Sequence, residues 1–157
     1  MTDDNPMAWQ ICHFDALDAK QLYELLKLRV DVFVVEQVCA YPELDGKDML
    51  ADTLHLTGRA QDGSLAAYAR ILAPGIRFSD ISFGRVVVAP LYRKTGQGHA
   101  LVKKILAEAG RFWPGKDITI GAQTYLQEFY RCHGFVPVSD PYLEDGIAHI
   151  DMTRNQA

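Results

Sequence analysis

The segment "RKTGQG", residues 93–98, combines positive charge with glycine in a way that suits an anion. It follows a β-branched run and leads directly into a helical pattern of apolar residues. The first turn of a helix presents backbone N–H groups without intrahelical partners and the positive end of the helix macrodipole. A diphosphate fits against these groups, and glycines remove the Cβ atoms that would keep it away from the backbone. The context favours this site over a plain loop before a surface helix.

Two widespread phosphate-binding loops do not match this segment. A Walker A loop ends in Gly-Lys-Ser/Thr, whereas Gly98 is followed by His99. A dinucleotide fingerprint needs a third small residue where Leu101 stands, and its acidic ribose ligand ends a strand, whereas Asp117 begins one. The pattern that does match is Arg/Gln-x-x-Gly-x-Gly/Ala.

Hydrophobic periodicity predicts the elements that would position this segment. Strands are expected over residues 8–14, 53–61, 64–72, 83–89, 117–123, 135–138 and 147–153, and helices from Asp15 or Asp18 to about Val34, from the glycine segment to Phe112 and over residues 125–133. Asp62-Gly63 predicts a hairpin with a type I′ turn, and Gly134 predicts a helix end. This mixture predicts an α/β or α+β fold, a layer of sheet with helices on its faces.

Length and composition indicate one globular domain over residues 1–157. The chain has 48% hydrophobic and 23% charged residues and a net charge of −4, which argues against bulk nucleic-acid binding. Its apolar runs are too short to span a bilayer, and its N-terminus lacks the basic start and apolar stretch of a secretion signal. The three cysteines are far apart, as in reduced proteins, so a cytoplasmic location is expected. The five histidines lack metal-ligand spacing, so no metal is expected.

Five further segments along the chain form an ordered set of motifs with the glycine loop. They are "RVDVFVVEQ", "DGKDMLADTLHL", "GRVVV", "GAQTYLQEFYRCHGF" and "DGIAHIDM". With the loop, this ordered set resembles the GCN5-related N-acetyltransferases (GNAT), and among them the ElaA-like branch, over roughly residues 20–153. The resemblance implies a mixed, twisted sheet of about six or seven strands with flanking helices, in which strands four and five splay apart.

The resemblance also implies acetyl-CoA as co-substrate. The loop would hold its pyrophosphate, and the backbone of the preceding strand would pair with the pantetheine amides as an added strand would. The residues implied in cofactor binding are Val86, Val87, Val88, Arg93, Lys94, Thr95, Gly96, Gln97, Gly98 and His99. For the valine side chains, a place in the core is the simpler interpretation.

Tyr130 stands where the family has a tyrosine whose hydroxyl faces the thioester sulfur. When an amine attacks acetyl-CoA directly, a thiolate leaves, and a phenol of pKa about 10 can protonate it. For a tyrosine considered alone, a role in the core or an interface would be the default interpretation. The motif favours the role of acid.

The attacking amine must lose a proton, so a base or a water chain is required. Glu36, Asp45, His55 and His149 are the candidates, and Glu36 is ranked first because it follows an apolar helix face and could project into a cleft. Each also has an ordinary structural interpretation. The acidic stretch Glu43, Asp45, Asp48 and Asp52 either attracts a cationic amine or is simply a solvated loop.

Two other functions stay open. One is a non-catalytic acyl-CoA-binding or sensor module, and the other is an enzyme like the acyl-homoserine lactone synthases, to which "LRVDVFVVEQ" has some likeness. The acceptor is expected to be a small-molecule or peptide amine, with no nucleic acid or membrane partner. The oligomeric state stays open, with a homodimer as one option because dimers are common in the family.

Overall fold

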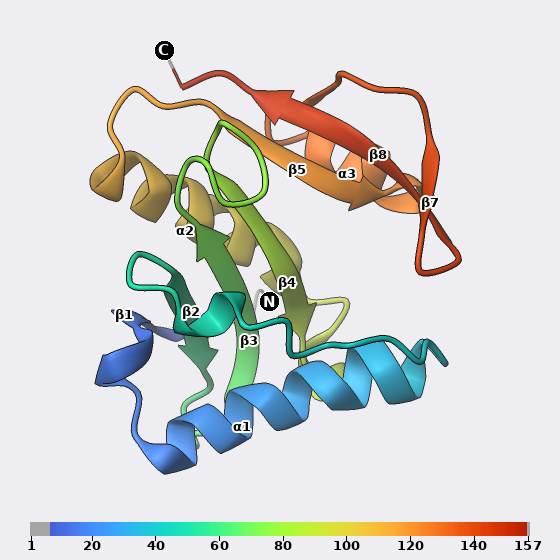
Figure 1. Ribbon diagram of the computed structural model, residues 1–157. Coiled ribbons are helices and arrows are strands. Elements are labelled where there is room, and N and C mark those ends of the chain that lie inside the picture. The colour runs from blue at the N-terminus through green and yellow to red at the C-terminus, as the bar shows by residue number, and fades with distance from the viewer. Residues whose placement is uncertain (1–6, 157) are drawn as a thin grey trace. The chain divides into compact units, whose positions relative to one another are not determined.

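The computed structural model describes residues 7–156 (Figure 1). The first six residues, on which the expectation about a secretion signal rests, lie outside the described part. The chain's internal contacts divide it into two compact units. The N-terminal unit runs to Arg70 and includes Arg85–Leu101, and the C-terminal unit comprises Ile71–Gly84 and the chain from Val102.

Within residues 7–156 the chain forms eight strands and three α-helices. The strands are β1 (Ala8–His13), β2 (Leu54–Arg59), β3 (Leu65–Leu72), β4 (Ser82–Val88), β5 (Ile118–Gln123), β6 (Val136–Pro137), β7 (Tyr142–Glu144) and β8 (Ile147–Arg154). The helices are α1 (Ala19–Arg29), α2 (Gln97–Phe112) and α3 (Gln127–Arg131). No helix in this part of the chain has the length and apolarity needed to cross a membrane.

The strands form two sheets of four strands each, in contrast to the single layer expected. One sheet has the order β1-β2-β3-β4; in the other, β8 pairs with β5, β6 and β7. The short strand β7 was not predicted, because its three residues are too few for a periodic pattern to emerge. Ile81 and Ile118 form an isolated parallel bridge at the starts of β4 and β5. The separation of strands four and five that the family implies stays a prediction.

The first predicted helix changes type along its length. It starts at a capping box in which Gln21 N donates to Asp18 Oδ1 at 2.7 Å, so Asp18 rather than Asp15 is the cap. The α-helix ends at Arg29, and residues Val30–Glu36 continue it as a π-helix. Apolar spacing predicted one uninterrupted helix, because the residue pattern does not report which backbone hydrogen bonds close each turn.

The N-terminal unit buries the inner face of α1 against its sheet. The buried cluster joins Leu25 of α1 and Val32 of the π-helix to Tyr68 of β3 and Val87 of β4. This confirms that the Val87 side chain belongs to the core. Strand β2 is buried on both faces although its sequence alternates, and its polar His55 is hydrogen-bonded to the Tyr68 hydroxyl and the Asp48 carbonyl.

The predicted hairpin between β2 and β3 is confirmed, but the predicted turn type is wrong. Gly63 has a φ of 86°, whereas Asp62 is absent from the residues with positive φ, so a type I′ turn is excluded. Gly63 N donates to Ala60 O at 2.9 Å, and Ala60 N donates to Ser64 O at 2.9 Å. This is the longer loop in which a type I turn is followed by a left-handed glycine.

The C-terminal unit holds an aromatic cluster beneath α3. Tyr130 packs against Phe83, Phe129 and Phe135 with ring centroids 5.1 to 6.1 Å apart. Helix α3 covers only Gln127–Arg131 of the predicted helix over residues 125–133, and the chain leaves it, as predicted, through Gly134, whose φ is 86°. Phe135 N donates to Tyr130 O, the long bond of a Schellman motif, so this end of α3 is fixed next to Tyr130.

Candidate active site

The glycine segment has the predicted strand–loop–helix setting. After β4, Pro90–Tyr92 forms a 3-10 turn, and α2 begins at Gln97. Gly96 has a φ of 78°, and a Cβ built on it would meet nothing within 4 Å. Backbone conformation, not crowding by the protein, therefore selects glycine here, and the backbone is left open on this side.

The first turn of α2 has the donors that the anion-site interpretation requires. The N–H groups of Gln97, Gly98 and His99 precede the first intrahelical bond, which Ala100 N makes to Gly96 O at 3.2 Å. The Thr95 hydroxyl donates to Tyr92 O at 2.7 Å, so it braces the loop. Lys94 adopts a φ of 64°, in the left-handed region that non-glycine residues rarely adopt.

Arg93 joins the loop to two other parts of the N-terminal unit. Its Nη1 and Nη2 atoms donate to the two carboxylate oxygens of Glu36, each at 2.6 Å, and its Nε donates to Val88 O at 3.2 Å. The bond from Arg93 lowers the pKa of Glu36 below its ordinary value. A carboxylate with a lowered pKa is a poorer base, so this pairing counts against the first-ranked candidate.

Strand β4 leads toward the loop through a strained residue. Arg85 has a φ of 53°, in the left-handed region that non-glycine residues rarely adopt. Its Nε lies 2.8 Å from Glu43 Oε2, and its Nη2 donates to the Glu43 carbonyl at 3.1 Å. The strain is therefore held by a buried carboxylate on the segment between α1 and β2.

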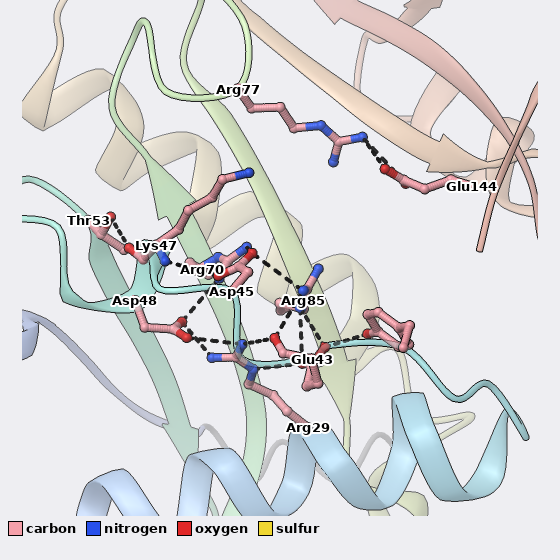
Figure 2. Close-up of polar contacts among 11 residues, drawn as sticks. Arg29, Glu43, Asp45, Lys47, Asp48, Thr53, Arg70, Arg77, Arg85 and Glu144 are labelled. Carbon is pink, nitrogen blue, oxygen red and sulfur yellow. Dashed lines mark hydrogen bonds and ion pairs between the residues drawn. The ribbon is translucent and has the colours of Figure 1, made fainter.

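Figure 2 shows a network of charged side chains around Glu43. Arg29 on α1 is fully buried; its Nε lies 2.9 Å from Glu43 Oε1 and its Nη1 lies 2.7 Å from Asp48 Oδ1. Arg70 on β3 binds both oxygens of Asp45, at 2.8 and 2.9 Å, and also reaches Asp48. Tyr41 adds a hydrogen bond to Glu43.

The network overturns both interpretations of the acidic stretch. Glu43 is 3% exposed and Asp48 is 6% exposed, so neither is solvated. Their charges, and that of Asp45, face arginines, which hold the pKa of Asp45 at about 2 and lower that of Asp48 although burial opposes both shifts. Of the four acidic residues, only Asp52 lies outside this network and stays exposed. The stretch therefore offers little uncompensated negative charge to a cation.

His55, another candidate base, is fully enclosed. Its Nδ1 lies 2.7 Å from the Tyr68 hydroxyl and its Nε2 lies 2.9 Å from Asp48 O. A carbonyl can only accept, so Nε2 carries the hydrogen and Nδ1 accepts from Tyr68. Burial lowers the pKa of His55, which keeps the ring neutral. Both nitrogens are occupied, so His55 positions the segment around Asp48 rather than serving as a base for an incoming amine.

In the C-terminal unit, Tyr130 is 6% exposed. Burial raises its pKa, so the hydroxyl stays protonated and is available as a donor. His149 is nearly buried; its Nδ1 lies 2.7 Å from Ile147 O and its Nε2 lies 3.5 Å from Glu144. These contacts match the structural interpretation of His149. No cluster of potential metal ligands is found among residues 7–156.

The sequence interpretation missed the three arginines of the network. Arg29, Arg70 and Arg85 each stand next to or within strongly apolar runs, "LRVDVFVV", "AYARIL" and "FGRVVV". An arginine in such a run is almost never buried unless it is paired. That signal was present, but it does not say which of the many carboxylates is the partner.

Similarity to known proteins identifies the family to which this geometry belongs. The model of the acetyltransferase (GNAT) domain matches residues 24–155. Protein ElaA of Escherichia coli K12 is 44% identical over 146 residues, covering 93% of this chain and 95% of ElaA. A crystal structure titled as an acyl-CoA N-acyltransferase from Pseudomonas aeruginosa has a TM-score of 0.89 at 44% identity, covering 94% of this chain and 99% of that one.

A more distant likeness shows the fold alone. The CoA-dependent acyl-homoserine lactone synthase BjaI has a TM-score of 0.75 at 17% identity, covering 96% of this chain and 84% of that one. The crystal structure of E. coli ElaA, by contrast, has a TM-score of 0.88 at 43% identity, covering 95% of this chain and 99% of that one. With a family model that spans most of its length and relatives of this similarity, the chain belongs to the GNAT acetyltransferase family.

Proposed function

We propose that this protein is an N-acetyltransferase that transfers the acetyl group of acetyl-CoA to an amine by direct attack within a ternary complex. The observation that carries the proposal is the segment at residues 93–98, where a left-handed glycine and the backbone amides of a helix start follow an edge strand and a short 3-10 turn. Such a helix start binds a diphosphate. Tyr130 is the proposed acid that protonates the leaving thiolate. The proton of the amine passes to water or to a base other than the enclosed His55.

Cofactor binding is tested first. Acetyl-CoA at 100 times its Kd should stabilise the folded protein by about 2.7 kcal/mol, which raises the Tm of a chain this size by about 5–10 °C. Differential scanning fluorimetry with acetyl-CoA, CoA and S-adenosylmethionine measures this. No shift with either CoA ligand contradicts the proposal, and a shift with S-adenosylmethionine alone favours a synthase. Turnover is followed by free-thiol release; CoA binding without release from any amine would favour a sensor module.

The charges of the network favour one class of acceptor. Arg29, Arg70 and Arg85 balance the three carboxylates at 43, 45 and 48, so the network itself carries no net charge; Lys47, next to Asp48 in the chain, places a positive charge beside it, whereas Asp52 lies outside the network. In Figure 2 the Lys47 side chain extends away from the network. Arg85 directly precedes the strand segment Val86–Val88 that is proposed to hold the pantetheine arm. We therefore propose an acceptor that carries an anionic group beside its amine.

Matched amines test the acceptor class. Lysine should be acetylated with a kcat/KM at least about fivefold above that of cadaverine, which lacks only the carboxylate, and tyrosine should exceed tyramine likewise; this ratio corresponds to about 1 kcal/mol. Lys47→Gln should reduce the preference, whereas Lys20→Gln, whose side chain is 87% exposed on α1, should leave it unchanged. A preference for cadaverine would contradict the proposed acceptor class and leave the acetyltransferase proposal standing.

A further inference from the structure

Arg93 is held at two points, and both matter for a cofactor. Its Nη1 and Nη2 atoms form a two-pronged ion pair with Glu36, and its Nε donates to the carbonyl of Val88. A planar guanidinium presents the same fork of donors to a phosphate as to a carboxylate. Glu36 therefore engages the very donors that Arg93 would offer to a diphosphate bound at the start of α2.

The Val88 carbonyl lies on the open edge of β4. Ala89 N donates to Ala66 O on β3 at 2.8 Å, and the C=O and N–H of one trans peptide point in opposite directions. The Val88 carbonyl consequently points away from β3, on the side where β4 has no neighbour in its sheet. A pantetheine amide pairing with β4 as an added strand would need this carbonyl, which now accepts from Arg93.

Glu36 is well placed to act as a reversible partner. It is the last residue of the π-helix Val30–Glu36, and the chain leaves that helix through Val38 at a φ of 50°. The side chains of Arg93 and Glu36 are 38% and 46% exposed. An exposed ion pair contributes little net stability, so a stronger anion can displace it at low cost.

We propose that Glu36 competes with the diphosphate of acyl-CoA for Arg93, so that the ion pair must open when the cofactor binds. Glu36 thereby sets the affinity for acyl-CoA instead of serving as the base. The inference rests on the proposed acetyl-CoA site. It assigns Glu36 a positioning role, exerted through Arg93.

The test compares CoA binding by three proteins in isothermal titration calorimetry at low salt. They are the wild type, Glu36→Gln and a control, Asp31→Asn. Asp31 lies in the same π-helix, and its carboxylate, 52% exposed, pairs with Lys27 at 2.6 Å. Both substitutions remove one negative charge from the same helix, so a general effect of net charge is matched and only the competition for Arg93 differs.

Glu36→Gln should bind CoA about three- to tenfold more tightly than the wild type, because the competitor is removed, and the gain should shrink at high salt. Asp31→Asn should change the Kd less than twofold. S-acetyl-pantetheine, which has no diphosphate and needs only the Val88 carbonyl, should gain clearly less than CoA from Glu36→Gln when followed by NMR titration.

An unchanged or weaker affinity of Glu36→Gln for CoA would overturn the inference, as would an equal gain in Asp31→Asn. A gain for S-acetyl-pantetheine equal to that for CoA would also count against competition with the diphosphate. Failure of the wild type to bind CoA at all would instead refute the proposed function, so the two failures are distinct.

Discussion

Tyr130→Phe should lower kcat for acetyl transfer about 100-fold, the lower end of what a general acid supplies. The ring lies in the aromatic cluster with Phe83, Phe129 and Phe135, and phenylalanine fills the same space. The substitution therefore removes only the hydroxyl. Burial keeps that hydroxyl protonated, so it can donate to the sulfur as negative charge develops there.

Discontinuous assays of free-thiol release would measure kcat, and calorimetric titration would measure the Kd for CoA. The Kd for CoA should stay within about twofold, because a group that acts on the leaving thiolate contributes to the transition state and little to ground-state binding. Tyr23→Phe is the control, because Tyr23 is 69% exposed on α1. A kcat for Tyr130→Phe within threefold of the wild type would remove Tyr130 from the mechanism.

Arg29→Leu should destabilise the protein by about 3–5 kcal/mol, as expected when one partner of a buried ion pair is removed. Arg29 is fully buried and its guanidinium binds Glu43 and Asp48, both of which are buried. Leucine would leave these carboxylates with only part of their compensation, from Arg85 and Arg70. The lower half of the range is expected because each carboxylate keeps one arginine.

Urea unfolding followed by circular dichroism provides the measurement. Arg131→Leu is a matched control, because its partner Glu128 is 86% exposed and the pair lies on a helix surface. Such a pair should contribute less than about 1 kcal/mol. If Arg29→Leu were no more destabilising than Arg131→Leu, the network would contribute no net stability and its role would be to orient the segment between α1 and β2.

Short-range features of the structure could be predicted from the sequence. A helix cap at Asp15 or Asp18, the glycine that follows α3 at Gly134 and the loop between β4 and α2 were all predicted. Each depends on the backbone preferences of a few consecutive residues. The ordered set of motifs also indicated the family, which the comparisons confirm.

Other features depend on residues that lie far apart in the sequence. The π-helix after Arg29 and the division of the strands into two sheets were not predicted, because periodicity reports which residues face the core and not how the elements close on one another. The turn at Gly63 shows the same limit on a smaller scale. Its glycine was recognised, but the positive φ predicted for the preceding Asp62 was wrong.

The sequence by itself predicted where an anion would bind, because a glycine loop at a helix start carries its donors in its own backbone. Only the tertiary structure decided which charged side chains are free to act. Glu36, the first-ranked base, forms an ion pair with Arg93. The carboxylates at 43, 45 and 48 form ion pairs with arginines contributed by α1, β3 and β4. A buried charge must find a partner, and the partner is chosen by proximity in space, which the order of residues along the chain does not reveal.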